Sequence, residues 1–327
     1  MRIENENMSN TDYRGLFEVM FSDGRIILSF IGLLLLMTGI FVCVQSYIGE
    51  FLPHDTAFLG MNAITLGAIN PKIVNFMFHD RVSFGSTIMS TGLLYIWLAE
   101  FPIRLKQAWA WWVYLISGIL GFTSFLTYIG HGYLDMYHAV SSLLLIPLFI
   151  IGLILSYKSY EVKPSFSLRY FKYQNNSLKG WAKYGYLSLI FTACGILAGG
   201  LVIMFVGMTT VYVPQDLEYM IMCNQDFSKI NSNLTALIAH DRASFGGGLA
   251  CVGLLIYCII NNASPSRNLW QILFIALSVG FLSVLFIHFS IGYTSFIHLL
   301  PAYIGTFLFY FGIINTYKYM YNRVDNV

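Results

Sequence analysis

The most regular feature of the sequence is a series of long apolar stretches separated by shorter polar segments. Eight of these stretches come near the length of about 20 residues that a helix needs to cross a bilayer. They cover residues 25–48, 82–99, 109–130, 137–157, 183–207, 243–261, 269–291 and 297–317. The pattern therefore predicts an all-α membrane protein with eight transmembrane helices.

The composition supports residence in a membrane. Hydrophobic residues make up 57% of the chain, charged residues only 10%, and the mean hydropathy is +0.66, whereas soluble domains carry about 25% charged residues. The net charge of +2 comes without a basic stripe, so membrane lipids are expected partners and nucleic acid is not. The five cysteines form no CxxC pair, which disfavours thiol redox chemistry.

Lysine and arginine are distributed unevenly between the two sets of connecting segments. Four of the 18 fall in one set, namely Lys72, Arg81, Lys229 and Arg242. Because positive residues concentrate on the cytoplasmic side of a membrane, both termini are predicted to be cytoplasmic, in a plasma or inner membrane. The loops at 49–81 and 208–242, and all seven histidines, then lie at the outer side.

A seven-residue motif occurs twice in the chain. Residues 79–85 read HDRVSFG, and residues 240–246 read HDRASFG, 161 positions later. Three further matches follow the same order, including Pro53-His54-Asp55 with Pro214-Gln215-Asp216 and, at an offset of 160, Gly132-Tyr133 with Gly292-Tyr293. Collinear matches of this kind indicate a tandem duplication.

The duplication predicts two parallel four-helix bundles related by a pseudo-two-fold axis along the membrane normal. Each repeat has an even number of helices, so both have the same orientation. The expected organisation is a cytoplasmic segment at 1–24, a first repeat at 25–157, a cytoplasmic linker at 158–182, a second repeat at 183–317 and a tail at 318–327.

Each repeat carries two histidines that are expected at the same depth on different helices. His79 and His240 precede the second helix of their repeats, and His138 and His298 begin the fourth. Second and fourth helices are commonly diagonal in a bundle, so two imidazoles could approach a haem from opposite sides. These four histidines are the candidate cofactor or metal ligands, whereas His288, like His131, has no counterpart in the other repeat.

This layout resembles that of the haem A synthase family. In that family, two similar four-helix bundles each carry a histidine pair near the extracytoplasmic side, on the second and fourth helices. The resemblance covers the whole chain as architecture, although Asp follows the histidine here where that family has Arg. It implies a haem-binding redox protein or oxidoreductase, with a quinone or another redox partner. It also implies pairing of His79 with His138 and of His240 with His298.

Two other functions fit the same residues. His79, Asp80, Asp135 and His138 could bind Zn or Fe, which would make the protein a metal-dependent enzyme that acts on a lipid or an exported substrate. Parallel repeats with ionisable groups near one face also fit a transporter or a non-catalytic membrane component.

The residues that follow His79 and His240 have a functional and a structural interpretation. Asp80, Arg81, Asp241 and Arg242 are candidate catalytic residues, because ionisable groups in a membrane are costly and usually functional. Alternatively, each aspartate caps the helix that it opens, and each arginine reaches the lipid headgroups or pairs with an aspartate. The serine and glycine that follow would then permit close helix packing.

Overall fold

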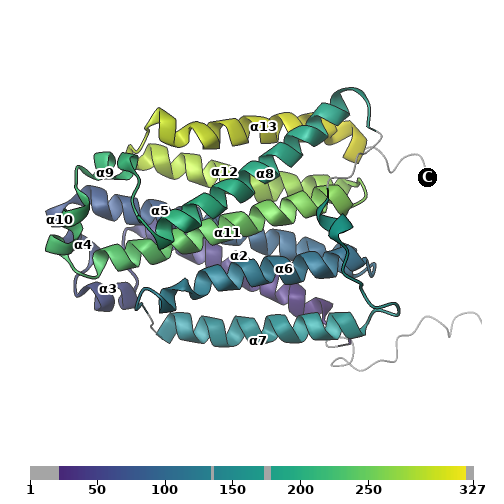
Figure 1. The fold of residues 1–327 in the computed structure, drawn as a ribbon, viewed down its shortest axis with the longest axis horizontal. Helices are drawn as coiled ribbons and strands as arrows, with labels where there is room; N and C mark the ends of the chain where they lie inside the picture. The colour runs from purple at the N-terminus through teal and green to yellow at the C-terminus, as the bar shows by residue number, and fades with distance from the viewer. Residues whose placement is uncertain (1–21, 134–135, 173–177, 322–327) are drawn as a thin grey trace, which may run out of the picture.

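The computed structural model describes residues 22–133, 136–172 and 178–321. Within these residues, eight long helices run side by side, and four short helices gather at one end, which we call the cap end (Figure 1). The long helices are α2 (Arg25–Ile48), α5 (Pro71–Leu98), α6 (Ala108–Phe125), α7 (Met136–Lys158), α8 (Gly180–Met208), α11 (Leu234–Asn262), α12 (Arg267–Ile291) and α13 (Phe296–Tyr321). The short helices are α3 (Pro53–Leu59), α4 (Ala63–Ile69), α9 (Pro214–Met220) and α10 (Asn224–Ile230).

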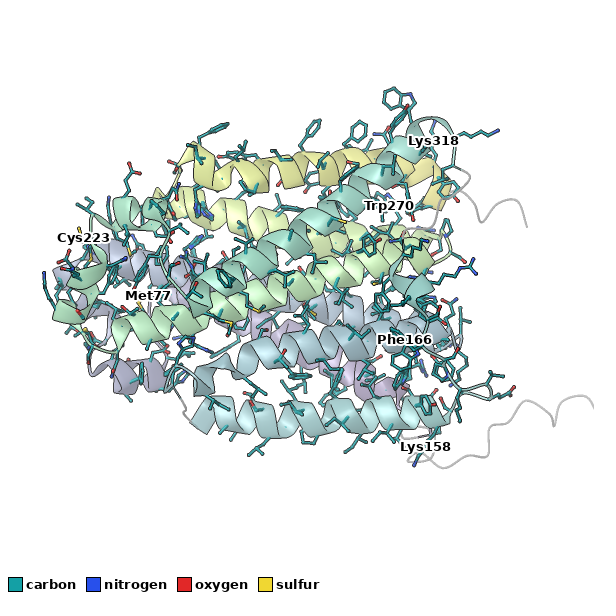
Figure 2. The ribbon with its side chains drawn as sticks, in the orientation of Figure 1. Met77, Lys158, Phe166, Cys223, Trp270 and Lys318 are labelled. Carbon is teal, nitrogen blue, oxygen red and sulfur yellow. The ribbon has the colours of Figure 1, made fainter. Side chains whose placement is uncertain are left out.

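Three shorter helical turns complete the described part of the chain. A π-helical turn, η1 (Ala99–Ile103), continues α5, and two 3₁₀ turns lie at η2 (Leu126–Ile129) and η3 (Leu168–Phe171). Figure 2 shows Lys158 and Lys318 at the end of the molecule opposite Cys223, which lies at the cap end. Basic residues of two separate segments therefore lie at the same end of the helices, as the charge pattern predicted.

Seven helices in the described residues are long and apolar enough to cross a membrane. They are α2, α5 together with η1, α7, α8, α11, α12 and α13. This result confirms the predicted all-α membrane class. The eighth long helix, α6, has 18 residues and lies where the remaining span is expected.

The helices that carry the repeated motif begin earlier than the hydropathy pattern predicts. Starts near residues 82 and 243 were expected, but α5 begins at Pro71 and α11 at Leu234. The motif therefore lies inside both helices, and Asp80 and Asp241 do not cap them. The prediction failed because the polar residues of the motif are buried among helices, whereas hydropathy assigns them to an outer loop.

The helices of the two repeats are interleaved. In addition to α2 of its own repeat, α5 packs against α11 and α12 of the second repeat, and α11 packs against both α8 and α6. About three quarters of the apolar window in α5 and α11 is buried (72% and 78%), against 28% or less in the other candidate spans. The two repeats therefore share one apolar core, with the third helix of each lying against the other repeat.

Glycines bring the helices of each repeat into close contact. A Cβ atom added at Gly246 would lie 2.1 Å from the backbone nitrogen of Met204 on α8, and one added at Gly85 would lie 2.9 Å from the carbonyl oxygen of Gly39 on α2. Small residues let helix backbones approach each other in membranes. The glycine of each motif therefore serves helix packing, as its structural interpretation predicted.

Replacement of Gly246 is expected to destabilise the protein. In Gly246→Val, α8 must move away from α11, which should cost about 1–3 kcal/mol, as other overpacked cores do. Gly195→Val on α8 is the control, because no atom lies within 4 Å of a Cβ added there. Thermal unfolding in detergent, followed by circular dichroism, should show a lower midpoint only for Gly246→Val. Equal midpoints would contradict the tight α8–α11 contact.

Candidate functional site

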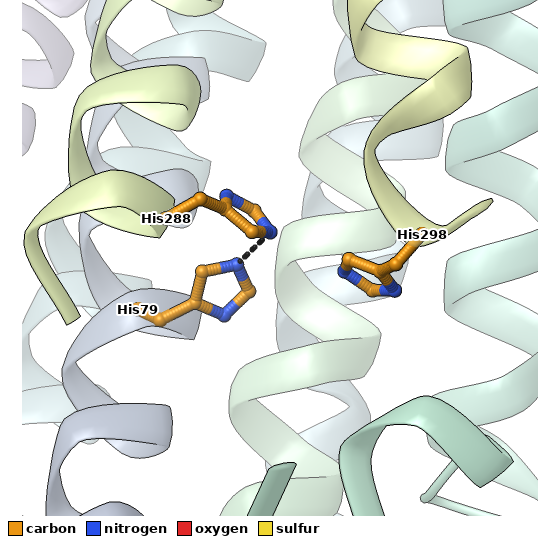
Figure 3. Close-up of side chains that lie close together, drawn as sticks. All are labelled: His79, His288 and His298. Atoms are coloured by element: carbon orange, nitrogen blue, oxygen red, sulfur yellow. Dashed lines mark hydrogen bonds between the residues drawn. The ribbon is translucent and has the colours of Figure 1, made fainter. Parts of the chain in front are cut away.

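Three histidine side chains from three helices meet near the cap end (Figure 3). His79 comes from α5 of the first repeat, and His288 and His298 come from α12 and α13 of the second. One ring nitrogen of each lies within 4.8 Å of one nitrogen of the other two, and the Nε2 atoms of His79 and His288 are 3.0 Å apart. His79 and His288 are buried, and His298 is half-buried. We call these residues the histidine cluster.

The structure brings two of the four predicted histidines together, but across the repeats. His79 and His298 belong to the cluster, whereas His240 is buried against the ring of Tyr133, with centroids 5.4 Å apart. The side chain of His138 lies outside the described residues, and so does Asp135. The contact that joins His79 and His298 differs from the expected pairing inside each repeat.

Neighbouring groups fix the ring of His288. Its Nδ1 atom lies 2.8 Å from the carbonyl oxygen of Val284, one turn earlier in α12. A carbonyl oxygen can only accept a hydrogen bond, so Nδ1 of His288 is the donor and carries the proton. Its Nε2 atom then keeps a lone pair, which accepts a hydrogen bond from Nε2 of His79 (Figure 3).

A tyrosine orients His298 in the same manner. The hydroxyl of Tyr293 donates to Oδ1 of Asp216 at 2.7 Å, and its oxygen lies 3.2 Å from Nδ1 of His298. Because the tyrosine proton is already used, Nδ1 of His298 is the donor and Nε2 keeps its lone pair. The aspartate, tyrosine and histidine thus form a chain of the kind that orients metal-binding histidines.

Two networks of ion pairs, each centred on an arginine side chain, lie beside the histidine cluster and connect the repeats. In the first, Arg81 pairs with Asp55 of α3 (Nη1 to Oδ2, 2.7 Å) and with Asp241 of α11 (Nε to Oδ2, 3.0 Å). The hydroxyl of Tyr133 also donates to Asp55. The short cap helix is thereby joined to both central helices.

The second network repeats these contacts with the two repeats exchanged. Arg242 pairs with Asp216 of α9 and lies 3.6 Å from Asp80 of α5 (Nε to Oδ2). Tyr293 donates to Asp216, as Tyr133 does to Asp55. Each arginine therefore forms an ion pair with one aspartate of its own repeat and one of the other, so the Asp and Arg residues of the motif link the two repeats.

Asp80 is the most unusual polar group of the site. It is 1% exposed, and neither carboxylate oxygen has a hydrogen bond from any residue that the structure describes. The nearest ring nitrogen, Nδ1 of His79, is 3.0 Å from Oδ1 but lacks hydrogen-bond geometry. The hydroxyl of Ser83, one turn along α5, is likewise buried without a hydrogen bond from the described residues. Buried polar groups in this state usually face a water, a proton or a ligand.

A cavity of about 830 Å³ begins at the histidine cluster. Six helices line it, namely α5, α8, α9, α11, α12 and α13, and most of the lining side chains are apolar. Asp80, Arg242 and the three histidines supply charged or ring-nitrogen groups at its cap end. An apolar cavity of this size with a few convergent polar groups is typical of small-molecule sites.

Tyr293, Asp216 and His288 were not predicted as site residues. For Tyr293 and Asp216, the sequence contained a signal in the internal repeat. Each has a counterpart in the first repeat, Tyr133 and Asp55, within the collinear matches. His288 has no such counterpart, so the repeat gave no reason to choose it as a ligand.

The carboxylate of Asp55 should make folding stability depend on acid pH. Burial alone would raise its pKa, but the Arg81 guanidinium and the Tyr133 hydroxyl outweigh burial and hold the pKa below the ordinary value of 3.8. Its stabilising contribution is therefore complete above about pH 4 and is lost as the pH falls through the lowered pKa. Thermal midpoints measured from pH 7 to pH 2 should fall less steeply in Asp55→Asn, and replacement of Asp226 by Asn should change the slope less, because its ion pair with Lys229 is exposed to solvent. An unchanged slope in Asp55→Asn would contradict this assignment.

No protein family model matches this chain, and no curated protein or solved structure shows significant similarity to it. The geometry of the site is therefore the basis for inferring the function.

Proposed function

We propose that the protein is a metal-dependent membrane enzyme whose metal is bound by His79, His288 and His298. The observation that carries the proposal is the convergence of three imidazole nitrogens, within 4.8 Å of one another, at the end of an apolar cavity. Imidazole suits Zn and Fe. Three protein ligands with an open fourth position are the usual arrangement of catalytic zinc.

The distances in the cluster are compatible with such an ion. Zn–N bonds of about 2.0–2.1 Å place tetrahedral ligand nitrogens roughly 3.3 Å apart. The Nε2 atoms of His79 and His288 are 3.0 Å apart, so a small outward rotation of either ring would admit the metal. The hydrogen bonds at Nδ1 of His288 and His298 support the tautomer that a metal requires.

The charges around the cluster favour a divalent cation. The two networks contain four carboxylates, those of Asp55, Asp80, Asp216 and Asp241, and two guanidinium groups. If all four carboxylates are ionised, two negative charges remain uncompensated in a largely buried region. A divalent ion beside Asp80 would neutralise them, which reduces the cost of burying charge.

The same proposal includes a topology. We place eight spans in the membrane, with α6 as the eighth, the two repeats related by a pseudo-two-fold axis, and both termini in the cytoplasm. The cap helices and the histidine cluster then lie at the outer side. The uneven distribution of lysine and arginine supports this orientation.

A haem-binding redox protein is the second candidate, and the size of the cavity favours it. Bis-histidine ligation needs two nitrogens about 4 Å apart, each roughly 2 Å from iron. The 4.8 Å limit that holds for His79 and His298 admits this spacing, whereas the 3.0 Å contact between His79 and His288 leaves no room for a porphyrin. Haem would thus use a histidine pair drawn from both repeats, and a quinone could serve as its redox partner.

Metal analysis together with an absorption spectrum of the purified protein tests the proposal. We expect about one equivalent of Zn or Fe per chain by mass spectrometry of the elements, and no Soret band. A Soret band that His298→Ala abolishes would replace the proposal with the haem alternative. Protein that contains neither metal nor haem, even after reconstitution with Zn²⁺ or Fe²⁺, would contradict both.

A further inference from the structure

We infer that the cavity receives the hydrocarbon chain of a membrane lipid, which enters sideways between α8 and α13. This inference rests on the proposed function, since the metal at the histidine cluster would act on the polar end of that lipid. The hydrocarbon chain would lie along α5 and α12, on the side of the histidine cluster that faces away from the cap end.

The length of the cavity matches one leaflet of a bilayer. Its lining runs from His79 to Ser90 on α5 and from Ala276 to His288 on α12. At a rise of about 1.5 Å per residue, each run is roughly 16–18 Å long. Half of a hydrocarbon core of about 30 Å is about 15 Å. A lipid chain could therefore extend through the cavity while its polar end stays at the level of the histidine cluster.

The wall of the cavity opens toward the bilayer between α8 and α13. Several lining residues on these two helices are themselves exposed at the protein surface, including Val202 (61%) on α8 and Ile297 (72%) on α13. Gly195 and Gly199 also line the cavity, and a Cβ added at either position would meet no atom within 4 Å. A chain could therefore pass from the membrane into the cavity without crossing a polar surface.

The two helices are in close contact toward the end opposite the cap. There, the hydroxyl of Ser188 donates to the carbonyl oxygen of Leu308 at 2.7 Å, and a Cβ added at Gly185 would lie 3.0 Å from the carbonyl oxygen of Gly312. From this contact, α8 crosses over to α11 while α13 continues along α12 (Figure 1). The two helices therefore diverge toward the cap end, where the histidine cluster lies (Figure 1).

The distribution of polar groups in the cavity fits an amphiphile. The hydroxyls of Ser86, Thr87 and Ser90 bond to backbone carbonyl oxygens, so this part of the wall offers little to a polar ligand. Asp80 and Ser83, nearer the cluster, have buried polar atoms without hydrogen bonds from the described residues. A polar head is thus favoured at the cluster and a hydrocarbon chain below it.

Photo-crosslinking in lipid nanodiscs tests the inference. One arm uses phosphatidylcholine with a diazirine at the end of one acyl chain, and the other uses a free fatty acid with the same label. We expect crosslinks on Gly280 and Phe281 of α12, which line the cavity and are half-buried. The arm that labels them identifies the source of the chain. Crosslinks confined to exposed residues such as Ile297 in both arms would overturn the inference.

Closing the opening should prevent this labelling. Gly199→Phe is expected to lower the crosslinks on Gly280 and Phe281 at least 5-fold. The control is Ala198→Phe, since Ala198 is an exposed neighbour outside the lining. Equal labelling of the two variants would contradict lateral entry.

Metal content of the same samples separates this inference from the proposed function. Internal crosslinks in protein that binds no metal would leave the lipid site standing and remove the enzyme proposal. Metal bound without internal crosslinks would do the reverse. Gly199→Phe should keep the metal content of the unmodified protein.

Discussion

Replacement of Arg242 by methionine should lower the free energy of unfolding by about 3–5 kcal/mol, the usual cost of leaving one partner of a buried ion pair alone. Arg242 is 6% exposed, and its partners Asp216 and Asp80 are 0% and 1% exposed. The Nη1 atom of Arg242 donates both to Asp216 and to the carbonyl oxygen of Val211. The guanidinium group also lies 5.0 Å from the centre of the Phe76 ring. The substitution therefore removes contacts among α11, α9 and α5 at once.

An exposed ion pair in the same protein provides the control. Lys229 and Asp226 lie 2.9 Å apart on α10, with side chains 71% and 39% exposed. Exposed pairs contribute little to stability because solvent screens them, so Lys229→Met should unfold at nearly the same denaturant concentration as the unmodified protein. Comparable losses in Arg242→Met and Lys229→Met, measured by denaturation in mixed micelles, would show that the buried network does not hold the repeats together.

Replacement of His288 by alanine should reduce the metal content of the purified protein from about one equivalent to background. Groups that only orient a ligand already change metal affinity by about 10–100-fold. Loss of one of three ligands is therefore expected to exceed about 100-fold. The measurement is elemental analysis after dialysis against a chelator, together with circular dichroism to verify that the variant is folded.

His54 serves as the matched control for the metal measurement. Its side chain is 9% exposed, it lies near Asp55 and Tyr133, and it is outside the histidine cluster. His54→Ala should therefore keep its metal. His298→Gln gives a second test, because it removes a ligand but retains a polar side chain. Full metal content in both His288→Ala and His298→Gln would rule out the three-histidine site.

The architecture could be predicted further from the sequence than the site could. Apolar length alone predicts the long helices, and the duplicated motif predicts that the repeats have equivalent parts. The predicted starts of α5 and α11 were too late along the chain, because hydropathy cannot distinguish a polar residue in water from one buried in an ion network. Asp80 and Arg81 have the same hydropathy in either place.

The set of residues that meet in the site depends on which helices are neighbours. Spacing along the chain does not contain that information. The regular distance from His79 to His138 predicted a pair inside one repeat. The structure instead places His298 beside His79. The reason is that α12 of the second repeat packs against α5, and α13 packs against α12. Only the retained Tyr293 and Asp216 gave a local signal that the site extends beyond the motif.

The exchange of third helices, with α6 on α11 and α12 on α5, has an evolutionary consequence. A single repeat would leave the faces of its second and third helices uncovered. A second copy would cover both faces, because the third helix of each copy would pack on the second helix of the other, as in an isologous homodimer. In such a dimer, any substitution appears in both sites. Fusion into one chain removes that constraint, and the two sites can then diverge. His288, present in only one repeat, is a change that a symmetric dimer could not have confined to one of its two sites.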